Sequence, residues 1–179
     1  MENRELLTSA KKIKLIALDN DGVLTGGQVM INDYGGAAKS YDIRDGLGVI
    51  MARKVGITFA IITGLKSPIV EERARQLGIE EVHQGLFDKC DILKHLLIRH
   101  NISSAQAAYM GDDIIDIPVF DEVGLSAAPA NAHIDVLKKA DWIAKCNGGM
   151  GAVRELTDFI LKSQGKYDHF LSEGDKKNN

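Results

Sequence analysis

The chain has 179 residues, 45% of them apolar and 26% charged, which is ordinary for a globular domain with its own core. The net charge of −3 argues against nucleic-acid or membrane partners, and no apolar stretch is long enough to span a bilayer. The polar, acidic amino terminus lacks the pattern of a signal peptide, so we expect a cytoplasmic protein. The two cysteines indicate reduced thiols rather than a disulfide framework.

Strand and helix patterns alternate along the chain, and we expect one domain over residues 1–179. The expected strands are 13–18, 58–62, 82–83, 107–110, 123–126 and 142–143. The expected helices are 3–11, one running from an N-cap at Asp45 to about 54, 68–76, 88–99, 114–120, 131–139 and 152–162. A β-hairpin insert is expected over about 26–44, and a flexible polar tail over about 165–179. This alternation predicts a three-layer, Rossmann-like α/β domain with a central parallel sheet.

Two acidic clusters follow expected strands. Asp19 and Asp21 come directly after the first strand, and Asp112 and Asp113 follow the strand 107–110. In a parallel sheet, ligands bind beyond the carboxyl ends of the strands, so both clusters should lie at one edge. Carboxylates gathered there would repel one another without a cation between them. The pattern therefore predicts a hard metal ion, Mg²⁺, and chemistry on an anionic substrate.

Two further residues sit where such chemistry would use them. Thr63 and Gly64 end the second strand, and Lys89 begins a helix. Taken singly, each feature has a structural explanation: an aspartate caps a helix, and a lysine is solvated in a first turn. Together they supply a nucleophilic carboxylate, a hydroxyl, a cation and metal ligands. That combination is typical of phosphoryl transfer, which depends on charge neutralisation and positioning.

These residues resemble the four motifs of the haloacid dehalogenase superfamily. The matching segments are Leu18-Asp19-Asn20-Asp21-Gly22-Val23-Leu24-Thr25, Ile61-Ile62-Thr63-Gly64, Lys89 and Gly111-Asp112-Asp113-Ile114-Ile115-Asp116. Over roughly residues 8–165 the chain also resembles the family of phosphatases acting on 3-deoxy-D-manno-octulosonate 8-phosphate (KDO 8-phosphate). The segments behind that narrower resemblance are Arg44-Asp45-Gly46, Gln84-Gly85 and Gly148-Gly149-Met150-Gly151-Ala152-Val153-Arg154-Glu155.

The resemblance implies a role for each matching residue. Asp19 would be the nucleophile and a Mg²⁺ ligand, and Asp21 the acid/base, which also offers its backbone carbonyl to the metal. Asp112 would complete the Mg²⁺ site, while Asp113 and Asp116 would orient neighbouring groups. Thr63 and Lys89 would act in catalysis by holding the phosphoryl oxygens. The implied substrate-binding residues are Asp21, Asp42, Ile43, Arg44, Asp45, Gly46, Gly64, Arg73 and Lys89.

Neither gap between the motifs is long enough for a cap domain, so the hairpin is the only insert expected over the site. The resemblance implies a homotetramer in which the hairpin and the glycine-rich segment before the last helix reach toward a neighbour's site. Three residues differ from the family's usual basic side chains: Ile50, Leu65 and Met150. Because cations are the expected readers of a sugar-acid phosphate, these differences bear on the substrate rather than on the chemistry.

The alternatives fall into several classes. A nine-carbon keto-sugar acid phosphate, or a broad range of phosphate esters, is the second choice of substrate. A response-regulator receiver also groups acidic residues with Thr and Lys, but in a different order along the chain. A non-catalytic scaffold with the same fold remains an alternative, and nucleic-acid end repair is disfavoured by the absence of a basic stripe.

Overall fold

The computed structural model describes residues 3–86 and 88–173, and the expected tail beyond 173 lies outside the described residues. The helices are α1 (Asn3–Ala10), α2 (Ile43–Lys54), α3 (Pro68–Leu77), α4 (Lys89–Arg99), α5 (Ile117–Phe120), α6 (Ile134–Lys139), α7 (Ala152–Ser163) and α8 (Asp168–Glu173). The strands are β1 (Leu15–Leu18), β2 (Met30–Ile31), β3 (Ala37–Ala38), β4 (Thr58–Thr63), β5 (Glu81–Gln84), β6 (Ala107–Met110), β7 (Leu125–Ala128) and β8 (Trp142–Ile143).

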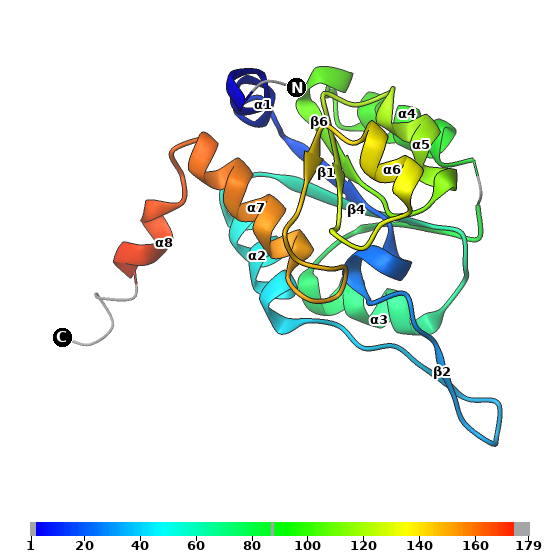
Figure 1. Cartoon of the computed structure of the whole chain (residues 1–179). Helices are drawn as coiled ribbons and strands as arrows, with labels where there is room; N and C mark the ends of the chain where they lie inside the picture. Colours follow the sequence, from blue (N-terminus) through cyan, green and yellow to red (C-terminus); the bar gives the residue numbers. More distant parts are fainter. Residues whose placement is uncertain (1–2, 87, 174–179) are drawn as a thin grey trace.

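Six of these strands form one parallel sheet in the order β5-β4-β1-β6-β7-β8. Its two faces are covered by different helices: α2, α3 and α7 on one side and α4, α5 and α6 on the other (Figure 1). The central strand β1 is buried along its whole length because it has a parallel neighbour on each edge and helices on both faces. The predicted three-layer α/β fold is confirmed, and β2 and β3 form the small antiparallel insert.

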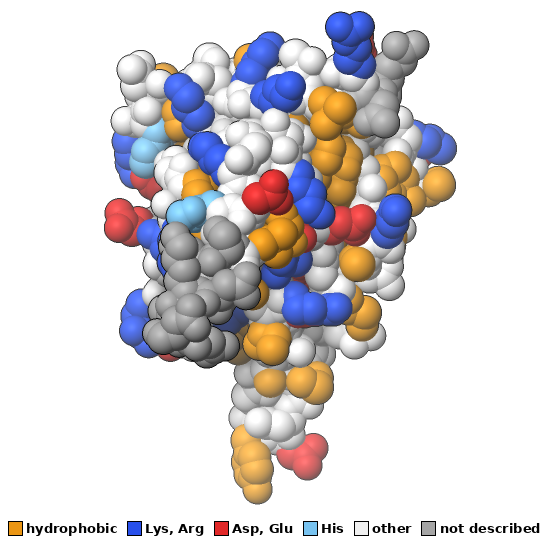
Figure 2. Space-filling model, turned by 90° about the vertical axis from the view of Figure 1, so that its left-hand side faces the viewer, with side chains coloured by type: hydrophobic (Ala, Val, Ile, Leu, Met, Phe, Trp, Pro, Cys, Tyr) orange, Lys and Arg blue, Asp and Glu red, His pale blue; other side chains and the backbone are white. Residues whose placement is uncertain are grey.

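The insert projects from the body of the molecule, and residues 3–86 and 88–173 form no further cap domain (Figure 1). Asn32 closes its turn, accepting hydrogen bonds from the amides of Tyr34 and Gly36 through its side-chain oxygen. Exposed apolar side chains run along this protrusion at the bottom of Figure 2, and they are Val29, Met30, Ile31 and Tyr34. An isolated pair of two-residue strands buries little apolar surface, so the hairpin is held mainly by its contacts at the base.

The start of α2 differs from the prediction. Asp42, rather than Asp45, is the N-cap, and its carboxylate accepts a 2.7 Å hydrogen bond from the Arg44 amide. Asp45 lies one turn further on and is buried, where its carboxylate accepts hydrogen bonds from the amides of Gly151 and Arg154. The sequence contains two aspartates that could cap this helix, and the packing of α7 against α2 decides between them.

Other boundaries also differ: β1 begins at Leu15, two residues later than expected, and α6 begins at Ile134, three residues later. Strand β7 begins two residues later than expected, because the Gly124 amide bonds to the carbonyls of Ser104 and Ala107 before the ladder with β6 starts. The expected flexible tail begins instead with α8, and the segment before it is anchored by the Gln164 side chain, which donates to the carbonyls of Ala10 and Ile13. Across the described ranges, every helix is too short or too polar to cross a membrane.

Candidate active site

The two acidic clusters meet at the carboxyl edge of the sheet, as predicted. Leu18 is in register with both Ile61 and Met110, so β1, β4 and β6 end side by side. The Asp19 amide donates to the Met110 carbonyl at 3.0 Å, extending the ladder by one residue. After Asp19 the chain turns through an irregular helical turn, Asn20–Leu24, in which Gly22 has a φ of +84°. This tight turn places Asp21 at the same edge.

Lys89 connects two of the carboxylates beneath this edge. Its ammonium donates to Asp19 Oδ2 at 2.7 Å and to Asp116 Oδ1 at 2.6 Å, and the side chain is fully buried. Burial lowers the pKa of Lys89, but the two carboxylates more than offset this, so its pKa is raised and the ammonium stays charged. Lys89 is therefore a fixed positive charge in the floor of the site.

Asp116 holds the site together rather than offering a free ligand. Its Oδ1 also accepts a 2.6 Å hydrogen bond from the Tyr109 hydroxyl, and its Oδ2 accepts from the amides of Asp112 and Asp113. Both oxygens of this fully buried carboxylate are thus occupied. The expectation that Asp116 orients its neighbours agrees with these contacts.

The acidic group has the composition of a magnesium site. Oxygens of Asp19, Asp112 and Asp116 lie within 4.8 Å of one another. Within the described part of the chain, these three residues form the one group of His, Cys, Asp or Glu side chains that could hold a metal ion together. Hard cations prefer oxygen ligands of this kind. A Cβ on Gly22 would lie 1.9 Å from Asp112 Oδ2, so the glycine is what lets the two loops approach this closely.

Uncompensated negative charge is visible in the pKa values of this group. Burial and the neighbouring charges of Asp19 and Asp116 raise the pKa of Asp112 to about 7. Burial, opposed by Lys89, raises the pKa of Asp19 to about 6. One lysine does not neutralise three carboxylates, so a divalent cation fits both the charge and the donor atoms of this site.

Asp21 is held by residues that the sequence did not single out. Its Oδ1 accepts from the ammonium of Lys39, which follows β3 of the hairpin and has a 5% exposed side chain. The same oxygen accepts from the Asn20 side-chain amide at 3.1 Å. Lys39 lies in the sequence between a turn and a helix, where a lysine is usually solvated, so only the path of the hairpin reveals this contact.

A hollow of about 260 Å³ opens over these carboxylates. Its lining residues are Asp19, Asp21, Gly27, Thr63, Gly64, Leu65, Asp112, Asp113 and Ile115. The structure thus brings together the predicted nucleophile, acid/base, metal ligand and the Thr63-Gly64 pair. Leu65 is one of the three residues that differ from the family pattern, and it contributes an exposed apolar wall. Ile50 and Met150 are exposed but do not line this hollow.

The predicted sugar-acid contacts lie outside this hollow within a single chain. They form the start of α2 and the facing side of α3, and they are Asp42, Ile43, Arg44, Asp45, Gly46 and Arg73. Arg44 pairs with Asp42 and donates to the Met150 carbonyl, while Arg73 donates to the Asp42 carbonyl at 3.2 Å. Asp45 and Gly46 are buried, and a Cβ on Gly46 would lie 2.6 Å from Arg73. Their substrate contacts stay predictions.

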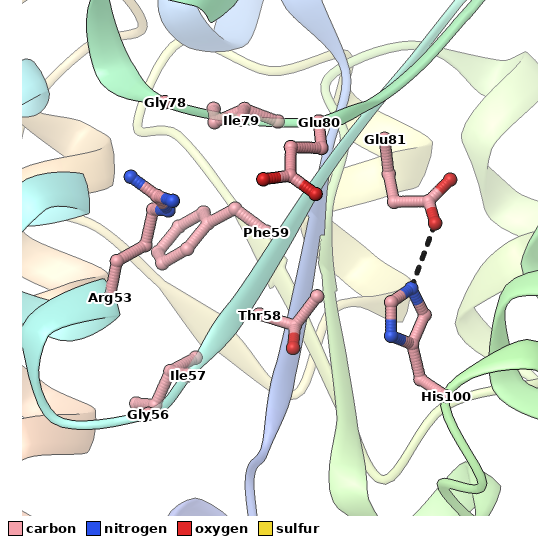
Figure 3. Close-up of a pocket in the computed structure, with 10 residues that line it drawn as sticks. All are labelled: Arg53, Gly56, Ile57, Thr58, Phe59, Gly78, Ile79, Glu80, Glu81 and His100. Carbon is pink, nitrogen blue, oxygen red and sulfur yellow. Dashed lines mark hydrogen bonds and ion pairs between the residues drawn. The ribbon is translucent and has the colours of Figure 1, made fainter.

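A second hollow of about 280 Å³ lies at the opposite end of the sheet, at the amino ends of β4 and β5 (Figure 3). Its main charged group is the carboxylate of Glu81, which accepts from His83, Arg99 and His100. Arg53, on the facing wall, donates to the Leu77 carbonyl at 2.7 Å. Glu81 and Arg53 are thus already paired within the protein, and Glu80 is the remaining charged residue of the lining. We assign the active site to the acidic edge, where several carboxylates lie together.

Comparison with known proteins agrees with this geometry. The family profile described as haloacid dehalogenase-like hydrolase matches residues 73–156. The KDO 8-phosphate phosphatase of Escherichia coli K12 is 42% identical over 164 residues, covering 92% of this chain and 87% of the relative.

Solved structures give the same result. The KDO 8-phosphate phosphatase of Moraxella catarrhalis, crystallised with a magnesium ion, a phosphate ion and KDO, is 38% identical, with a TM-score of 0.94. The match covers 96% of this chain and 99% of that one. The enzyme from Yersinia pestis is 40% identical with a TM-score of 0.90, over 92% and 89% of the two chains. The chain belongs to the KDO 8-phosphate phosphatase family of the haloacid dehalogenase-like hydrolases, and it is a phosphoric monoester hydrolase.

Proposed function

We propose that this enzyme hydrolyses 3-deoxy-D-manno-octulosonate 8-phosphate to the free sugar acid and phosphate, with Mg²⁺ as its cofactor. The observation that carries the proposal is the buried Asp19 carboxylate, held by Lys89 in the floor of the hollow and followed two residues later by Asp21. The choice of substrate is inferred from the relatives, since the Moraxella catarrhalis enzyme was crystallised with phosphate and KDO.

The residues suggest a two-step reaction. In the first step, the Asp19 carboxylate attacks phosphorus, the bond from phosphorus to the sugar oxygen breaks, and Asp21 donates a proton to that oxygen. In the second step, Asp21 takes a proton from a water molecule that attacks the aspartyl-phosphate, releasing phosphate and regenerating Asp19. Lys89 and Thr63 hold the phosphoryl oxygens during both steps.

A bound Mg²⁺ would neutralise negative charge on the phosphoryl group and on the carboxylates. Asp19, Asp112 and the backbone carbonyl of Asp21 are the groups that would hold it. Asp113 caps the turn beginning at Ile114 through a 2.7 Å bond to its amide, so it is occupied in shaping the loop.

The test is phosphate release with Mg²⁺ and with EDTA. Asp19→Asn should reduce turnover by at least ~1,000-fold, because amide nitrogen and oxygen are poor nucleophiles toward phosphorus. Asp121→Asn, at an exposed aspartate after α5, is the matched control and should retain wild-type turnover. Substantial turnover by Asp19→Asn would remove that residue from the nucleophile role.

One observation favours a second substrate class. Leu65 lines the hollow at the position where the family usually has arginine, so one expected cation for an anionic substrate is absent. A nine-carbon keto-sugar acid phosphate, or a broad range of esters, is therefore the alternative. Comparing kcat/KM for the eight- and nine-carbon sugar-acid phosphates, a hexose phosphate and p-nitrophenyl phosphate distinguishes these possibilities. A preference for the eight-carbon substrate supports the main proposal.

We also propose a homotetramer in which neighbouring subunits complete the site. Apolar side chains are exposed on the hairpin, including Ile31, and on α2, including Ile43, which is 83% exposed. Exposed apolar surface of this kind is typical of interaction sites. A nucleic-acid or membrane partner is not proposed, and the cytoplasmic location stays a prediction from the sequence.

Light scattering tests this assembly against the chain mass of 19.5 kDa. Ile31→Ser should shift the mass toward the monomer and lower turnover. Ile98→Ser, at an equally exposed position on α4, is the matched control and should change neither. A wild-type monomer with full activity would contradict the proposal.

A further inference from the structure

A short segment after the hairpin, residues 39–42, is referred to here as the strap. It lies against the turn Asn20–Leu24 that carries Asp21, which we call the catalytic turn. The Tyr41 hydroxyl donates to Asn20 Oδ1 at 3.1 Å. The Asn20 side-chain amide in turn donates to Asp21 Oδ1 at 3.1 Å. Lys39 pairs with the same carboxylate oxygen. The strap therefore reaches Asp21 by two routes, one direct and one through Asn20.

These contacts make the two oxygens of Asp21 unequal. Oδ1 accepts from Lys39 and Asn20, and the Thr25 hydroxyl lies at 3.5 Å. Oδ2 is buried and has no hydrogen-bond partner among the described residues. Asp21 lines the hollow, and both of its oxygens are restrained: Oδ1 by these donors and Oδ2 by burial.

The strap is anchored on its far side by α3. The guanidinium of Arg73 lies over the Tyr41 ring, 5.3 Å from its centroid, and donates to the Asp42 carbonyl at 3.2 Å. Asn20 is fully buried, so its amide cannot exchange this pairing for water. Arg73, Tyr41, Asn20 and Asp21 therefore form a continuous chain of contacts from α3 to the catalytic turn.

We propose that Tyr41 and Asn20 are positioning residues that hold the Asp21 carboxylate in the rotation that serves proton transfer to the leaving oxygen of the substrate. This inference rests on the proposed role of Asp21 as the acid/base. A carboxylate that rotates about its side-chain bonds delivers its proton less often to the leaving oxygen. The hydrogen-bond chain limits that rotation, and the contact of the partly buried Tyr41 ring with Arg73 of α3 holds the chain in place.

The test uses the leaving group, because a poor leaving oxygen needs the proton and a good one does not. Tyr41→Phe removes one hydroxyl and keeps the ring under Arg73. We expect it to lower kcat about tenfold for an alkyl phosphate such as the sugar-acid phosphate, because one hydrogen bond that helps to orient Asp21 is lost. For p-nitrophenyl phosphate the loss should stay below about threefold, since p-nitrophenolate leaves without protonation. KM should change little for either substrate.

Tyr167→Phe is the matched control, because that hydroxyl contacts Asp158 at 3.4 Å far from the site. It should leave both rates unchanged. Asn20→Ala interrupts the same chain, so the double variant Asn20→Ala/Tyr41→Phe should lose little more than Asn20→Ala alone. Thermal unfolding of each variant verifies that it is folded.

Two outcomes would overturn the inference: unchanged kcat for the alkyl phosphate in Tyr41→Phe, or equal losses for both substrates. Additive losses in the double variant would also contradict it. Failure of the proposed function looks different, because then the wild-type enzyme shows no Mg²⁺-dependent turnover or Asp19→Asn stays active. A change of preferred substrate alone does not affect the comparison between alkyl and aryl esters.

Discussion

Asp112 allows a quantitative test of the acidic site, because replacing it with asparagine removes one charge and keeps nearly the same shape. Burial and the charges of Asp19 and Asp116 raise its pKa from 3.8 to about 7. Each unit of difference between the unfolded and folded pKa corresponds to about 1.4 kcal/mol. Ionised Asp112 therefore lowers the unfolding free energy of the metal-free protein by about 4 kcal/mol before solvent screening. The side chain is partly exposed, and screening reduces this to about 2 kcal/mol.

The sign of the effect follows from proton binding. Between pH 3.8 and about 7 the folded chain keeps a proton that the unfolded chain has released. The stability contributed by protonated Asp112 is therefore fully present below this window and is lost as the pH rises through it. In EDTA at about pH 8, Asp112→Asn should unfold with a free energy about 2 kcal/mol higher than that of the wild type, and near pH 4 the difference should disappear.

Urea unfolding with EDTA and with Mg²⁺ measures this. Mg²⁺ at about a hundred times its Kd should stabilise the wild type by about 2.7 kcal/mol, and it should stabilise Asp112→Asn far less. Asp121→Asn, the same substitution at an exposed position, is the control. An Asp112→Asn protein that is less stable than the wild type in EDTA at high pH would refute the charge-repulsion argument. An equal response of both proteins to Mg²⁺ would refute the role of Asp112 as a ligand.

Two further substitutions test the packing around this site. Lys89→Met leaves Asp19 and Asp116 buried without their cation, so it should lower the unfolding free energy by about 3 kcal/mol or more. Urea unfolding measures this loss, with Lys138→Met as the exposed control. A loss no larger than that of the control would contradict the role of Lys89 as a buried ion-pair partner. Gly22→Ala places a Cβ against Asp112 and should reduce Mg²⁺-dependent turnover at least ~10-fold. Gly35→Ala has a similar positive φ with open space around it, so equal losses in the two variants would attribute the effect to backbone strain alone.

Much of the fold and the core of the site could be predicted from the sequence. The apolar run ending at Asp19 reads as a buried strand, and the acidic cluster at Asp112 follows another, so the rule for parallel sheets brings them to one edge. The motif spacing then indicates phosphoryl transfer. These inferences succeed because they depend on local patterns: side-chain alternation, turn residues and the position of a residue relative to the end of its strand.

The tertiary structure decided the contacts between residues far apart in the chain. Two aspartates could cap α2, and the packing of α7 made Asp42 the cap while burying Asp45. Lys39 and Tyr41 reach the catalytic turn only because the chain returns alongside it after the projecting hairpin. Such contacts carry no local sequence signal, since their energy comes from burial and from partners that the packing of separate elements brings together.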